Sequence, residues 1–238
     1  MKKTLIYAFV LIIIVIIGVE IINLNKKKEP DVSIVMPPQS VDMCYQYSKE
    51  MPSGYFDRAF LEMHILGDKV TGEYSNLPSE KDSKVGTFEG TVGPMDPKIS
   101  ARLADVWWNS TAEGMNAKEQ LNIKFGEGSA VALFGEMVDR GDGTYVYKDA
   151  AHLTPGFRMS QTSCELMKEM FSVEKYVRDN IKTIVKEKPV LGGTWYATVV
   201  YVNPSTKTGT MKYEDGHIQK KTNFRYKIDK TMVIITLI

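Results

Sequence analysis

Hydrophobic and polar positions follow three patterns along the chain, and the first is a long apolar run near its start. Leu5–Val19 is apolar apart from Tyr7 and Gly18, and Ile21 and Ile22 extend the run past Glu20. As a helix, residues 5–22 would measure about 27 Å, close to the thickness of a bilayer core. The pattern predicts a single-pass transmembrane anchor within residues 1–28, with the lipid bilayer as partner through residues 5–22.

A cleaved signal peptide is the alternative, because it has the same basic start. The run is long and rich in isoleucine, and it lacks a small-x-small cleavage site. A lipoprotein signal would need a cysteine at the end of the run, and the first one is Cys44. We therefore favour an uncleaved anchor. Lysines flank the run on both sides, so the positive-inside rule does not decide its orientation.

The second pattern is a period of two that extends over residues 44–150, after a proline-containing spacer predicted at residues 29–43. Apolar residues alternate with polar ones, and Gly67-Asp68 and Gly126-Glu127-Gly128 are typical of tight turns between strands. Seven or eight short sequential strands predict an antiparallel meander, which could form a closed barrel or a sandwich. We favour the barrel, since no long crossover is evident.

The third pattern appears at residues 162–187, where apolar residues recur every three or four positions. Thr162 and Glu165 fit a capping box, and Pro189 lies just past the end of the pattern, so we expect one helix of about six turns. Four strands follow between residues 194 and 237. The chain is thus predicted to be mainly β, or α+β overall, with residues 151–238 forming a helix and a small antiparallel sheet.

Composition and charge narrow the class of protein. Apolar residues make up 43% and charged residues 25%, as in ordinary globular proteins. Residues 1–28 have five lysines and one glutamate, which leaves 25 basic and 28 acidic side chains for the remainder. A mildly acidic soluble region is a poor match for phosphate backbones, so we expect no nucleic-acid partner.

The two cysteines, Cys44 and Cys164, are candidates for a disulfide if the soluble region lies outside the cytoplasm. The alternative is a pair of buried thiols in a domain that faces the cytoplasm. His64, His152 and His217 are scattered, and no Cys or His pair has zinc spacing, so we predict no metal site.

Candidate chemistry is sparse. Trp107 and Trp108 should place one indole on each face of a strand, and one of them could form the floor of a glycan or lipid site. Arg140-Gly141-Asp142 matches the integrin-recognition tripeptide, although a glycine-rich turn explains it. We predict no catalytic or cofactor-binding residue, because the motifs for nucleophilic, phosphate-binding and metalloprotease sites are absent. Five glutamates could in principle supply paired carboxylates: Glu73, Glu89, Glu113, Glu119 and Glu136.

Several motifs mark resemblances. Gly67-Asp68-Lys69-Val70-Thr71-Gly72, Glu80-Lys81-Asp82-Ser83-Lys84 and Gly86-x-Phe88-x-Gly90 resemble segments of uncharacterised bacterial envelope lipoproteins with a lipid-bearing Cys-Tyr start. This chain has Cys44-Tyr45 but an apolar N-terminal run in place of a lipobox, which implies a different anchor for a similar domain.

The C-terminal region carries further resemblances. Segments 176–181, 191–196 and 213–218 are similar to C-terminal modules of uncharacterised bacterial membrane-anchored proteins. Gly193-Thr194-Trp195-Tyr196 is similar to the first strand of lipocalins and avidins, but too few residues follow it to form such a barrel. None of these resemblances implies a known activity.

These observations predict a non-enzymatic protein of the plasma membrane with an extracytoplasmic β-rich region. Its partner would be a small molecule, a glycan or a neighbouring envelope protein. Two alternatives remain open, namely a cell-wall or glycan hydrolase that uses paired carboxylates and a structural or assembly protein of the envelope.

Overall fold

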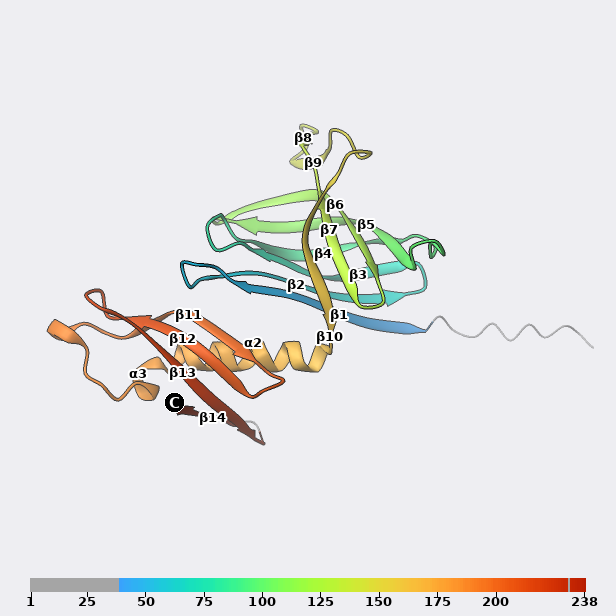
Figure 1. The fold of residues 1–238 in the computed structure, drawn as a ribbon. Helices are drawn as coiled ribbons and strands as arrows, with labels where there is room; N and C mark the ends of the chain where they lie inside the picture. The colour runs from blue at the N-terminus through green and yellow to red at the C-terminus, as the bar shows by residue number, and fades with distance from the viewer. Residues whose placement is uncertain (1–38, 231) are drawn as a thin grey trace, which may run out of the picture. The chain divides into compact units, whose positions relative to one another are not determined.

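The computed structural model describes residues 39–230 and 232–238 (Figure 1). The predicted transmembrane helix and residues 29–38 of the predicted spacer lie outside the described residues. Among the helices that are described, none has the length and apolar character needed to cross a bilayer. Residues 40–43, which we assigned to the spacer, belong instead to the first strand of the sheet, β1, which begins at Ser40.

A closed barrel of eight antiparallel strands forms the N-terminal part of the described chain. The strand order is β5-β4-β3-β2-β1-β10-β7-β6, and pairing between β5 and β6 closes the ring. The favoured barrel is therefore confirmed. Its strands are β1 (Ser40–Glu50), β2 (Phe56–Leu66), β3 (Lys69–Leu77), β4 (Lys84–Val92), β5 (Ala101–Ala112), β6 (Met115–Gly126), β7 (Ser129–Phe134) and β10 (Thr154–Thr162).

The barrel includes a strand that lies beyond residue 150, where we expected it to end. β10 pairs with β7 on one side and with β1 on the other, and a β-bulge interrupts its register between Pro155 and Arg158. Only Met159 is fully buried in β10, so buried and exposed residues do not alternate along this strand. A short hairpin precedes β10, formed by β8 (Met137–Asp139) and β9 (Thr144–Tyr147), and β9 joins the edge of β6.

Side chains fill the interior of the barrel. Inward-facing positions alternate along most of the strands, and the buried set includes Tyr45, Leu61, Tyr74, Trp108 and Ile123. An eight-stranded barrel has an interior just wide enough for such filling. The side chains that remain exposed on the barrel therefore lie on its outside and at its rims.

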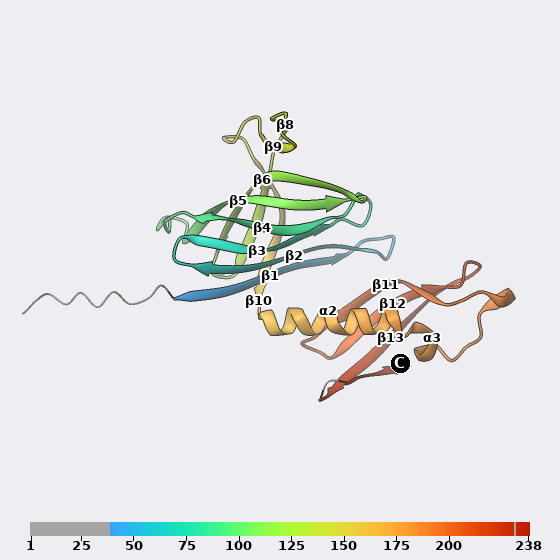
Figure 2. The same ribbon diagram turned by 180° about the vertical axis from the view of Figure 1, so that it is seen from behind.

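Residues 164–238, called here the helix–sheet module, form a second core. Its helices are α2 (Cys164–Asp179) and α3 (Ile181–Ile184), followed by the 3₁₀ turn η1 (Val190–Gly192). The sheet has the order β11-β12-β13-β14, and Figure 2 shows α2 lying along it. The four predicted strands are confirmed as β11 (Tyr196–Asn203), β12 (Thr208–Glu214), β13 (Gln219–Asp229) and β14 (Met232–Leu237).

The predicted single helix of residues 162–187 is wrong in two respects. Its N-cap is Ser163, whose hydroxyl accepts a hydrogen bond from the backbone N–H of Leu166. The helix is also interrupted at Asn180, which has non-helical angles and donates to the carbonyl of Tyr176 from both its backbone and its side chain. Both bonds go to this one carbonyl, and the non-helical angles of Asn180 end α2 before the apolar pattern ends.

A disulfide joins the two parts, as predicted. Cys44 on β1 is bonded to Cys164, the first residue of α2, with their Cα atoms 5.1 Å apart. Ten residues further along α2 from Cys164, both carboxylate oxygens of Glu174 accept hydrogen bonds from the Arg58 guanidinium of β2, at 2.7 and 3.0 Å. Cys44 and Phe60 point out of the barrel and belong to the core of the helix–sheet module.

Candidate functional site

Trp107 and Trp108 lie on opposite faces of β5, as expected. Trp108 is inside the barrel, 1% exposed, and its indole N–H donates to the carbonyl of Gly86 at 3.1 Å. Trp107 is half-buried on the outer face, with the Lys118 ammonium 5.7 Å from its ring centroid. Of the two residues named as a possible binding surface, Trp108 is thus the core residue, and only Trp107 lies where a ligand could reach it.

The five candidate glutamates do not converge. Glu119 is held inside the barrel by Ser110 and Lys84, Glu113 occupies a turn with positive φ, and Glu136 pairs with Lys148. Only Glu73 and Glu89 share a surface, a depression on the outer side of β2–β5. Glu62, which pairs with Glu73 across β2 and β3, lines the same depression, so three carboxylates lie on this open surface.

Two of the three histidines and the Arg140-Gly141-Asp142 segment have local structural roles. His64 lies 2.6 Å from Asp42 and His152 lies 2.7 Å from Asp149. Throughout residues 39–230 and 232–238, no group of three or more His, Cys, Asp or Glu side chains could hold a metal ion. Asp142 accepts hydrogen bonds from Thr144, which hold the pKa of the Asp142 carboxyl below its usual value, and Gly141 adopts positive φ. The turn interpretation thus accounts for the tripeptide.

A groove lies on the barrel wall, at a different place from the depression over β2–β5 and with a similar volume. It encloses about 500 Å³ and lies over the ends of β6, β7 and β10. Register brings Lys124, Val131 and Arg158 into one row across these three strands. We call this site the basic groove. Its lining is Ile99–Ala101, Lys124–Glu127, Ser129–Val131, Pro155, Gly156 and Arg158.

Local irregularities shape the basic groove. The β-bulge in β10 lies between Pro155 and Arg158, and such bulges bend a strand and redirect its side chains. Ser100 has a φ of 48° in the connection that leads into β5, and this connection forms the opposite wall. The floor contains the buried Phe125 and Ala130. The groove is therefore partly apolar and is held by the barrel frame.

The electrostatics of the groove differ from those of the barrel around it. Residues 39–163 carry 12 basic and 18 acidic side chains, a net charge of −6. Within the described chain, neither Lys124 nor Arg158 has a carboxylate partner within 4.0 Å; Arg158 donates only to the Ser129 hydroxyl, at 3.2 Å. Glu127 is the one acid among the lining residues.

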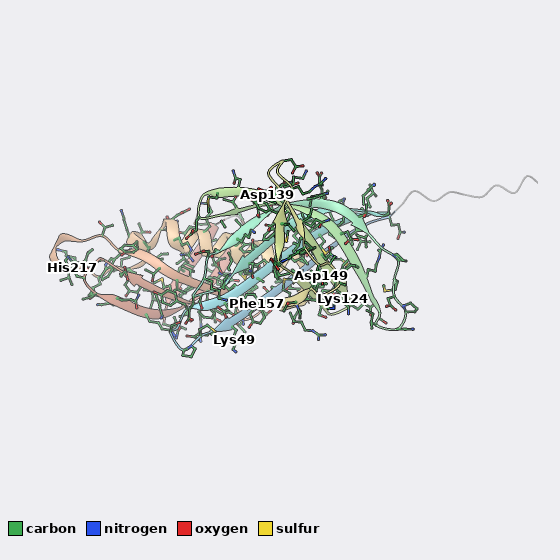
Figure 3. The ribbon with its side chains drawn as sticks, turned by 90° about the horizontal axis from the view of Figure 1, so that it is seen from above. Lys49, Lys124, Asp139, Asp149, Phe157 and His217 are labelled. Carbon is green, nitrogen blue, oxygen red and sulfur yellow. A yellow bond between two sulfur atoms is a disulfide. The ribbon has the colours of Figure 1, made fainter. Side chains whose placement is uncertain are left out.

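The two cations are spaced for an extended ligand. They flank Val131 on strands that are two positions apart in the sheet, which corresponds to about 10 Å. A guanidinium binds carboxylate or phosphate through two parallel hydrogen bonds, whereas an ammonium acts as a point charge. The arrangement can therefore bind an anionic ligand that also contacts the apolar floor. Lys124 is labelled in Figure 3.

Sequence reasoning did not find this site. Lys124 stands between Ile123 and Phe125 in a strand with regular alternation, so it read as one more outward-facing polar residue. Arg158 lies in β10, which was not predicted as a strand. Only the pairing of β6, β7 and β10 brings the two cations together.

Comparison with known proteins identifies no relative, since no family model, curated protein or solved structure matches the chain.

Proposed function

We propose that this chain is a membrane-anchored, extracytoplasmic binding protein without catalytic activity. In this proposal the basic groove binds a ligand that carries phosphate or carboxylate groups, such as an anionic envelope glycan or a lipid headgroup. The observation that carries it is the row of Lys124, Val131 and Arg158, in which two cations without a carboxylate partner flank an apolar residue on an acidic barrel.

The chemistry of the groove favours an anionic ligand over a neutral one. The two cationic side chains extend from backbone positions about 10 Å apart, so they can reach successive anionic groups of a polymer or the two ends of one extended molecule. Phe125, Val131 and Pro155 add apolar contact, which a fully hydrated inorganic ion would not use. The negative charge of the rest of the barrel would direct an anion toward this groove rather than to other parts of the wall.

The location rests on two supports. The apolar run at residues 5–22 predicts the anchor, although it lies outside the described residues. The Cys44–Cys164 disulfide favours an oxidising compartment, because thiols are kept reduced in the cytoplasm.

The experiment compares the full-length chain with two double variants. Lys124→Glu/Arg158→Glu reverses the groove, and Lys69→Glu/Lys81→Glu makes the same charge change at exposed barrel positions outside its lining. Binding of poly(glycerol phosphate), with neutral dextran as the comparison polymer, is measured by titration. Charged hydrogen bonds contribute about 1.5 kcal/mol or more each, so we expect the groove variant to lose about 100-fold in affinity.

The control variant should retain most of its affinity, and wild-type binding should weaken with added salt. Native mass spectrometry of protein purified from its own membranes provides an independent measurement, in which a bound ligand appears as excess mass that denaturation removes. Equal losses in both variants, or equal binding of dextran, would contradict the proposal.

A further inference from the structure

The outer strand of the small sheet is β14, and among residues 39–230 and 232–238 no strand pairs with its outer edge. It pairs with β13 on one side and is last in the strand order. Its residues, Met-Val-Ile-Ile-Thr-Leu, include no charge and no proline, and its register with β13 shows no bulge. Charges, prolines and bulges are the usual means by which proteins protect an edge strand from pairing. This edge has none of them.

The backbone groups that face outward can be identified from the ladder. The Ile238 N–H donates to the carbonyl of Asn223 at 3.0 Å, so residues of the same parity on β14 direct their backbone groups toward β13. Val233, Ile235 and Leu237 therefore direct their N–H and C=O groups away from the sheet. The edge offers three donors and three acceptors in the alternation that another antiparallel strand requires.

We infer that β14 pairs with β14 of a second copy of this chain, in antiparallel register centred on Ile235. This register places Met232 opposite Ile238 of the second copy, and these are the two most exposed apolar side chains of the segment, at 65% and 61%. It also places Ile234 opposite Thr236. No charged residues meet across the new pair, so the strand is complementary to itself.

The surrounding charge distinguishes this pairing from another way in which two copies could meet. The helix–sheet module carries 13 basic and 8 acidic side chains and could be attracted to the acidic barrel of a second molecule. In the β14 pair, the two β13 strands with Arg225 and Lys227 lie three strand spacings apart, about 14 Å. At physiological salt the Debye length is about 8 Å, so repulsion between the two basic modules is screened at this distance, whereas at low salt it is not. Salt should therefore strengthen β14 pairing and would weaken barrel-to-module attraction.

The experiment measures the dimer dissociation constant of the full-length chain in detergent by analytical ultracentrifugation, at low and at physiological salt. Thr236→Lys places a charge on the exposed edge, and Gln219→Lys adds the same charge to an exposed position of β13 in the same sheet. We expect Thr236→Lys to weaken the dimer at least about 10-fold, the effect of one unfavourable edge charge of about 1.4 kcal/mol. Gln219→Lys should leave the dimer unchanged.

Disulfide trapping tests the register. A mixture of Ile234→Cys and Thr236→Cys chains should cross-link more efficiently than either variant alone, because only the mixture brings the two thiols opposite each other. A monomer at all concentrations, a dimer insensitive to Thr236→Lys, or a dimer weakened by salt would overturn the inference. The basic groove is not involved, so these outcomes are independent of ligand binding.

Discussion

The barrel and the helix–sheet module bury their apolar residues in different ways. The barrel closes on itself, so inward-facing side chains from eight strands are enclosed without outside help. The module has only four strands in an open sheet, and it covers one face with α2. Its core also includes Cys44 and Phe60 from the outer face of the barrel. The barrel core is therefore self-contained, whereas the module core includes part of the barrel.

The two regions also differ in charge, with −6 on residues 39–163 and +5 on residues 164–238. The near-neutral total over residues 39–238 hides this opposition. In each region the feature we assign to binding is unlike its surroundings, because the acidic barrel carries the basic groove and the basic module has an uncharged edge strand. A small feature that differs from its surroundings is more informative here than the net charge.

The disulfide should have the largest effect on the module. Cys44→Ala/Cys164→Ala opens a link across a sequence separation of 120, and the chain-entropy model assigns such a loop about 5 kcal/mol. We expect the free energy of unfolding of the full-length chain to fall by about that amount. Hydrogen exchange should show faster exchange in α2 and β11 than in β3–β5.

Wild-type protein treated with a reductant serves as the control and should match the double variant. Equal loss of protection in α2 and in the barrel strands would contradict the expectation that the disulfide stabilises the module more than the barrel.

Two consecutive residues of β2 belong to different cores. Phe60 points outward into the module core, and Leu61 points inward into the barrel core. Phe60→Ala should cost about 3–5 kcal/mol and Leu61→Ala about 2–5 kcal/mol, as for other large-to-small changes in cores. We expect Phe60→Ala to loosen α2 and Leu61→Ala to loosen the barrel ladder, as measured by residue-resolved hydrogen exchange.

The same exchange pattern in both variants would mean that the cores unfold as one cooperative unit. A conservative Phe60→Leu variant should recover most of the loss, because it restores apolar volume at this site.

The smallest expected effect is the pH dependence that Glu174, the partner of Arg58, adds to the free energy of unfolding. Burial raises the pKa of the Glu174 carboxyl above its ordinary value of 4.5, outweighing the opposite influence of Arg58. Since the folded state then holds the proton more tightly, Glu174 contributes stability that is present below pH 4.5 and is lost as pH rises through the raised pKa. Urea unfolding at a series of pH values should show this fall in wild type and not in Glu174→Gln.

Glu165 provides a control of opposite sign. Its hydrogen bond from Ser163 lowers the pKa of the Glu165 carboxyl, so its contribution is present above the ordinary pKa and is lost as pH falls. If Glu165→Gln and Glu174→Gln shifted the pH profile in the same direction, the burial argument for Glu174 would be wrong.

Local patterns were sufficient for much of the fold. Alternation marks β2, where Leu61 and Met63 are buried, and the position of Asp68 after Gly67 marks the turn that follows it. The three- and four-residue spacing of Met170, Val173 and Val177 marks α2. These signals work because a strand or helix with one buried face repeats its geometry every two or 3.6 residues.

Other features depended on neighbours that are distant in the sequence. β10 was missed because a single buried residue, Met159, gives no period, and its place in the barrel depends on pairing with β7 and β1. The interruption at Asn180 was missed because apolar spacing continues through it, while the non-helical backbone angles of that residue end the helix.

The sequence by itself determined the apolar N-terminal run, the strand and helix classes, and the cysteine pair that forms the disulfide. Only the tertiary structure decided that Trp108 is buried and Trp107 is not, that Lys124 and Arg158 share a row, and that β14 keeps an open edge. The physical reason is that periodicity reports which face of an element is apolar. Strand order and register, which bring distant residues together, depend on pairing across the whole sheet.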